Sequence, residues 1–205
     1  MIKARRKNPP AAAPAIDPPQ PGRPGPVVTV TGVLMGLWCL GFAVVNLVFE
    51  VTGHFTSGAY AHYTSGISVM DWLVAGLKVA GAAVALLSVA QRPRLVSPAI
   101  VTVLVWAAFA TLGVYVLGSV AEAAGMRLGL IGGVRQIDMR SVAYLLFFLV
   151  AAAGYGVLAT SYSRRYPGAK GLVILGVLGA PALLGLLLLA LPALLAASGL
   201  LPARG

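Results

Sequence analysis

The sequence has little charge and very little acid. Only 10% of its 205 residues are Asp, Glu, Lys or Arg, and five of them are acidic. An ordinary soluble domain contains about 25% charged residues. With 59% hydrophobic residues and a mean hydropathy of +0.92, this chain could not cover itself with polar groups in water. The composition therefore excludes a soluble globular protein and predicts a polytopic membrane protein.

The sequence also lacks the motifs of common enzymes. Its single cysteine, Cys39, allows no disulfide within the chain. It contains no Cys-x-x-Cys pair, no His-Glu-x-x-His, no Gly-x-Ser-x-Gly, no P-loop and no dinucleotide fingerprint. The two histidines, His54 and His62, are spaced like no compact metal signature. We therefore expect no catalysis, no bound cofactor and no metal site.

Residues 1–26 form a segment of their own. They hold eight of the fourteen prolines and five basic residues. Proline has no backbone N–H to donate and fixes φ, so this segment lacks the means to build a helix or a sheet. We expect a disordered, basic, proline-rich tail on the cytoplasmic side of the membrane.

Residues 27–205 are expected to form an all-α bundle. Five apolar runs each approach the ~20 residues that a helix needs to cross a ~30 Å hydrocarbon core. The five transmembrane helices are expected at about 27–51, 69–90, 98–120, 141–161 and 171–193. Pro181 and Pro192 lie in the last run, and we expect them to kink this helix or to end it early.

The basic residues between these runs predict an orientation. With the N-terminus inside, the cytoplasmic segments hold ten Lys and Arg and the outer segments hold four. Cytoplasmic loops carry the excess of Lys and Arg, which predicts the N-terminus inside and the C-terminus outside. This rule accounts for most of the net charge of +10, so no nucleic-acid partner is expected.

Small and polar residues recur at three- and four-residue steps along the first two predicted helices. On the first helix these are Gly32, Met35 or Gly36, Cys39, Ala43, Asn46 and Glu50. On the second helix they are Asp71, Ala75, Lys78, Ala82 and Ala85. Small faces let helix backbones approach closely in lipid. We expect the two faces to meet each other or the bundle interior, and such faces to offer contacts for a second copy or another membrane protein.

Lys78 is the most informative residue of the sequence. We place it about 10 Å below the outer boundary, at 1.5 Å per residue. A central charge costs about 2.5–3.5 kcal/mol on insertion scales, so the ammonium needs a partner or a route to the interface. The candidate partners form a polar cluster with it: Asn46, Glu50, His54, Asp71 and Lys78. This cluster is either a structural charge pair between two helices or a site for a proton, an ion or an anionic ligand.

Two stretches of the sequence carry a family resemblance. The second predicted helix contains MDWLVAGLK at residues 70–78, and the third contains VWAAFATLGVY at residues 105–115. Over roughly residues 30–120 the chain resembles small uncharacterised multi-pass membrane proteins of high-GC actinobacteria, which have no assigned activity. The resemblance implies a multi-pass architecture in the bacterial inner (plasma) membrane, and it carries over no catalytic residue.

Two functions are compatible with this sequence. The first is a non-catalytic accessory or scaffold protein of the plasma membrane, which acts through helix packing and its basic tail. The alternative is a small transporter or an ion- or proton-linked carrier that uses Lys78, Glu50 and Asp71. Many transporters are built from two structural repeats, and five spans do not divide into equal halves, which favours the first function.

Overall fold

A computed structural model describes residues 22–53, 64–90, 96–130, 139–168 and 170–197 of the chain. Within these ranges the side chains of residues 64–71, 187–193 and 195–197 are outside the description. The described chain is all-helical, as the sequence predicts. Its five helices are α1 (Pro26–Val51), α2 (Thr64–Val89), α3 (Pro98–Arg127), α4 (Met139–Arg165) and α5 (Lys170–Ala197). The basic tail expected at residues 1–26 lies almost wholly outside the described residues.

Four of the five helices are long and apolar enough to cross a membrane. They are α1, α3, α4 and the Trp72–Val89 part of α2. In α5 the apolar stretch with described side chains, Lys170–Leu186, is shorter. The protein is therefore a multi-pass membrane protein, while the complete crossing by α5 and the orientation of the bundle stay predictions.

Local sequence signals explain where α1 and α3 begin and where α3 ends. Pro26 and Pro98 stand in the first helical turn, where the missing N–H is not needed. The Ser97 side chain accepts a hydrogen bond from the Ile100 N–H at 3.4 Å and caps α3. At the other end of α3, Gly129 has φ of 70°, and Leu130 N–H donates to the Gly125 carbonyl at 2.9 Å. This is the Schellman arrangement that glycine favours.

Most helices extend beyond the membrane spans that the apolar runs predict. α2 begins at Thr64 instead of 69, and α3 continues to Arg127 instead of 120. Residues 121–127 read AEAAGMR and contain good helix formers, so the helix outlasts its apolar run. α5 continues through Pro181 and Pro192 to Ala197, so the expected early end is wrong, while the alternative, a kink at these prolines, stays a prediction. Transmembrane helices tolerate proline when neighbouring groups satisfy the freed carbonyls.

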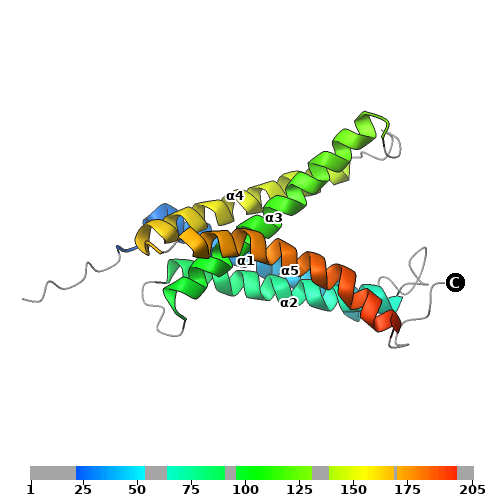
Figure 1. The fold of residues 1–205 in the computed structure, drawn as a ribbon, viewed down its shortest axis with the longest axis horizontal. Coiled ribbons are helices and arrows are strands. Elements are labelled where there is room, and N and C mark those ends of the chain that lie inside the picture. The colour runs from blue at the N-terminus through cyan, green and yellow to red at the C-terminus, as the bar shows by residue number, and fades with distance from the viewer. Residues whose placement is uncertain (1–21, 54–63, 91–95, 131–138, 169, 198–205) are drawn as a thin grey trace, which may run out of the picture.

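The helices converge at one end of the bundle and diverge at the other (Figure 1). We call the first end, where α1, α3 and α5 begin and α2 and α4 finish, the closed end. At the opposite, open end the last part of α3 and the first part of α4 leave the other helices together (Figure 1). We call this pair, residues 117–127 and 139–146, the arm; on its α4 side, Arg140, Ala143 and Tyr144 still line a pocket together with Phe42 of α1. α1 packs mainly on α2, and α5 packs mainly on α3.

The small-residue faces of α1 and α2 meet, as the sequence predicts. Gly32, Met35, Gly36, Cys39 and Ala43 are the buried residues of α1. A Cβ atom on Gly32 would lie 2.5 Å from a methyl group of Val89, and one on Gly36 would lie 3.4 Å from Leu86. On α2, Ala82 is 3% exposed and Ala85 is fully buried. Close approach of the two backbones therefore depends on the absence of side chains at these glycines.

Candidate functional site

Lys78 lies among aromatic rings of two neighbouring helices. Its Nζ atom is 4.5 Å from the centroid of the Trp38 ring, 4.9 Å from that of Phe148 and 5.4 Å from that of Phe42. Trp38 and Phe42 come from α1 and Phe148 comes from α4. We call these three rings the aromatic enclosure. One cation on α2 thus contacts side chains of two other helices.

The aromatic enclosure stabilises the charge of Lys78 inside the membrane. The negative face of an aromatic ring attracts a cation, with about 0.5–1 kcal/mol per contact when exposed and about 2 kcal/mol or more when desolvated. Three such contacts are comparable with the ~2.5–3.5 kcal/mol that insertion scales assign to a central charge. The Lys78 side chain is half-buried in the structure.

The rings of the enclosure belong to a larger aromatic cluster. The centroids of Trp38 and Phe42 are 5.0 Å apart, and both rings also contact Phe147 at 5.2–5.4 Å. Tyr115 of α3 lies 4.5 Å from Phe148 and extends the aromatic cluster to a third helix. Tilted and edge-on pairs at these separations are favourable for aromatic rings. Contacts within the aromatic cluster therefore hold the ring faces toward Lys78.

A second polar contact lies one helical turn from Lys78, toward the closed end. The Cys39 Sγ and the Tyr155 hydroxyl are 3.1 Å apart and are almost fully buried, with exposed fractions of 3% and 1%. A Cβ atom on Gly81 of α2 would lie 3.1 Å from this sulfur and 3.2 Å from the hydroxyl oxygen. The glycine thus leaves room for a hydrogen bond between α1 and α4 beside α2. These two polar groups satisfy each other inside the core.

The structure separates the residues of the predicted polar cluster along the helices. Lys78 lies at one level, and Asn46, Glu50 and the backbone of Asp71 lie nearer the open end. α1 and α2 are antiparallel, with Phe42 level with Lys78 and Gly36 level with Leu86. Asn46 and Glu50 lie one and two turns farther along α1 and are half-buried. By this register the backbone of Glu50 is level with that of Asp71, about two turns from Lys78.

Two of the predicted contacts of Lys78 stay untested. His54 lies outside the described residues, and so does the side chain of Asp71. The expected reach of Lys78 toward Glu50 and Asp71 is therefore still a prediction. α2 begins at Thr64, fourteen residues before Lys78, but a helix start does not mark the membrane boundary, so the depth expected for Lys78 stays a prediction.

Sequence reasoning missed the aromatic enclosure, although a signal was present. Trp38 and Phe42 are four residues apart and each directly precedes a residue of the buried face, Cys39 or Ala43. They therefore flank this face on one side of α1. Phe148 could not be assigned in this way, because the rotation of α4 against α1 is set by the packing of the whole bundle. No protein-family model, curated protein or solved structure matches the chain.

Proposed function

We propose that the protein is a non-catalytic accessory or scaffold protein of the plasma membrane. The observation that supports this proposal is the aromatic enclosure of Lys78. A carrier needs its ionisable group to meet water or substrate from each side in turn. Here the ammonium faces three rings on two neighbouring helices, so its contacts are those of a structural joint between α1, α2 and α4.

The tight seam beside Lys78 supports the same proposal. Gly32 and Gly36 bring α1 against α2, and the Cys39–Tyr155 contact joins α1 to α4. Access to Lys78 from the closed end would require these contacts to open. A joint of this kind stabilises a fixed arrangement of helices, which suits a protein that holds others in place.

The arm offers a surface for such a partner. Leu117 is 69% exposed on α3 and Leu146 is 56% exposed on α4, while the arm leaves the other helices (Figure 1). Small and apolar helix surfaces associate in lipid through van der Waals packing. We propose that the arm packs against another membrane protein or a second copy of the chain.

Site-specific photo-crosslinking in intact membranes tests the scaffold function. A photoreactive residue at Leu117 or Leu146 is expected to give a protein adduct of one defined mass. The matched control is Leu178 on α5, which is similarly exposed at 65% and lies outside the arm. Adducts with lipid alone at all three positions would contradict the proposed function.

A flux assay distinguishes the scaffold from the carrier. The purified chain is reconstituted into vesicles that contain a pH-sensitive dye, and a pH gradient is imposed. The scaffold function predicts that the gradient decays as in empty vesicles, for the natural chain and for Lys78→Met. A faster decay that Lys78→Met abolishes would overturn the scaffold proposal in favour of the proton-linked carrier.

A double-mutant cycle tests the structural joint itself. Phe148→Leu removes one ring from Lys78, and Lys78→Met removes the charge from the rings. We expect Phe148→Leu to cost about 0.5–2 kcal/mol more when Lys78 is present than in the Lys78→Met background, because the cation then loses its ring contact. Unfolding in mixed detergent measures both values. Equal costs in the two backgrounds would show that the ring does not stabilise the cation.

A further inference from the structure

We propose that the groove between α3 and α4 at the open end binds a phospholipid whose headgroup carries a primary ammonium. The groove has a volume of about 460 Å³. Its polar lining comes from Tyr115, Ser119 and Glu122 of α3 and from Ser141 and Tyr144 of α4. The proposal concerns a different face from the protein contacts of the arm and does not depend on them.

The position of the groove along α3 suits a lipid headgroup. Glu122 lies twenty-four residues from Pro98, which corresponds to about 36 Å along the helix. Tilts of up to about 40° reduce this height to no less than roughly 28 Å. The hydrocarbon core is about 30 Å thick. If α3 enters the core near Pro98, Glu122 therefore reaches the boundary between acyl chains and headgroups on the far side.

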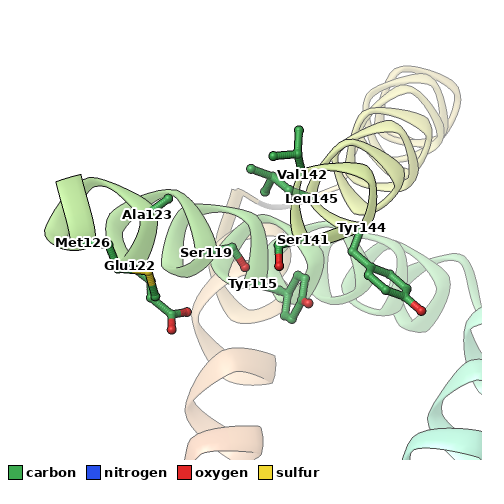
Figure 2. A pocket seen from close by; sticks show the side chains of 9 residues that line it. All are labelled: Tyr115, Ser119, Glu122, Ala123, Met126, Ser141, Val142, Tyr144 and Leu145. Carbon is green, nitrogen blue, oxygen red and sulfur yellow. The ribbon is translucent and has the colours of Figure 1, made fainter. Parts of the chain in front are cut away.

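The polar side chains of the groove point to a common side. Figure 2 shows the hydroxyls of Ser119 and Ser141 close to the Tyr115 ring, with the Glu122 carboxylate and the Tyr144 ring directed to the same side. Val142 and Leu145 of α4, with Ala123 and Met126 of α3, supply the apolar part of the groove lining (Figure 2). The groove thus combines one carboxylate and several hydroxyls with apolar side chains, as a lipid headgroup and the start of its acyl chains require.

The chemistry of this face favours an ammonium ligand. No hydrogen bond or ion pair joins the Glu122 carboxylate to another residue of the described chain. A primary ammonium donates three hydrogen bonds, which the carboxylate and the neighbouring Ser119 and Tyr115 hydroxyls can accept. The two tyrosine rings add faces that attract a cation. A quaternary ammonium has no N–H to donate, so it would use the charge and the rings alone.

A positive side chain near the groove suits the phosphate of the same headgroup. The Arg140 guanidinium lies 5.9 Å from the centroid of the Tyr144 ring. α3 and α4 run antiparallel and pair Tyr115 with Phe148, so Glu122 is level with Ser141, the neighbour of Arg140. Glu122 in the groove and Arg140, which lines the neighbouring pocket and shares Tyr144 with the groove, therefore lie at the same height. This pattern matches a zwitterionic headgroup better than an anionic one.

Native mass spectrometry of the full chain tests the proposal. The protein is released from detergent with an equimolar mixture of phosphatidylethanolamine, phosphatidylcholine and phosphatidylglycerol of identical acyl chains. We expect the natural chain to retain phosphatidylethanolamine about fivefold more than phosphatidylglycerol, and more than phosphatidylcholine. Glu122→Gln is expected to abolish the preference over phosphatidylcholine, because it removes the charge that the ammonium meets.

A matched variant distinguishes lipid binding in the groove from a general effect of removing one negative charge. Asp17→Asn makes the same kind of change, from a carboxylate to an amide, outside the five helices, and we expect it to keep the natural preference. Thermal unfolding of each variant reports whether the bundle is intact. Equal retention of the three lipids by the natural chain, a preference for phosphatidylglycerol, or an unchanged preference in a folded Glu122→Gln variant would each overturn the proposal.

Discussion

The closed end and the open end of the bundle are held by different kinds of contact. At the closed end, Arg165 of α4 donates a hydrogen bond to the Ser88 carbonyl of α2 at 2.5 Å, and Trp106 of α3 donates to the Ser163 hydroxyl of α4 at 2.9 Å. At the open end the arm leaves the other helices and its polar side chains line a groove (Figure 2).

The fully buried residues of α3 and α4 also gather at the closed end. The fully buried residues Val101, Val105, Leu158 and Tyr162 lie in the halves of α3 and α4 nearest the closed end. In lipid, polar contacts and close packing, and not hydrophobic burial, hold helices together. The closed end concentrates such contacts, whereas the open end is where we propose that lipid and protein partners bind.

Gly176→Ala should give the largest effect, because it separates two helices at the closed end. A Cβ atom on Gly176 would lie 2.6 Å from the Val103 carbonyl oxygen and 2.8 Å from the Cβ of Trp106. A backbone carbonyl cannot move aside as a flexible side chain can, so α5 must shift away from α3. We expect a loss of about 1–3 kcal/mol in the free energy of unfolding.

Denaturation in mixed detergent, followed by circular dichroism, measures this loss. Gly171→Ala is the control on the same helix, because no atom lies within 4 Å of a Cβ atom there. Equal stability of the two variants would contradict the close packing of α5 against α3.

Arg165→Gln should have an intermediate effect. The substitution removes the charge-assisted hydrogen bond to Ser88 and the contact with the Tyr162 ring, whose centroid lies 5.4 Å from the guanidinium. A hydrogen bond to a charged group contributes about 1.5–3 kcal/mol, and the half-buried position reduces this to about 1 kcal/mol. The neighbouring Arg164 is exposed, so Arg164→Gln is the control in the same unfolding assay. A larger loss of stability with Arg164→Gln than with Arg165→Gln would show that the contacts of Arg165 do not stabilise the closed end.

Gly118→Ala at the open end should have the smallest effect. Gly118 lies on the arm, and no atom is within 4 Å of a Cβ atom at this position. Alanine restricts the unfolded chain and favours a helix, so we expect the free energy of unfolding to rise by about 0.5–1 kcal/mol. A loss of stability would mean that the arm packs against another helix, and the contrast between the two ends would then be wrong.

The sequence was sufficient for the helices and for one packing face. The three- and four-residue recurrence from Gly32 to Ala43 predicted the buried side of α1 correctly, because small residues mark close approach in lipid. The aromatic enclosure and the divergence of the arm were not predictable in the same way. Both depend on how α3 and α4 rotate and tilt against α1, and many weak contacts set these angles together.

Helix ends were predictable only where the apolar run and the helix coincide. α1 begins one residue before its predicted start, whereas α3 extends seven residues beyond its predicted end. The stop signal of α3 is Gly129, which is in the left-handed region and follows a run of helix formers. Hydropathy predicts where a segment leaves the hydrocarbon core, whereas a helix ends where a cap satisfies its last backbone carbonyls.

The length of α3 makes the shape of the protein sensitive to bilayer thickness. Its thirty residues measure about 45 Å, which exceeds the hydrocarbon core by about half. A helix longer than the core adjusts by tilting, and it needs less tilt when the membrane is thicker. We therefore expect a thicker membrane to bring the arm nearer to the membrane normal and a thinner one to tilt it further, so that the lipid environment itself sets how far the bundle opens.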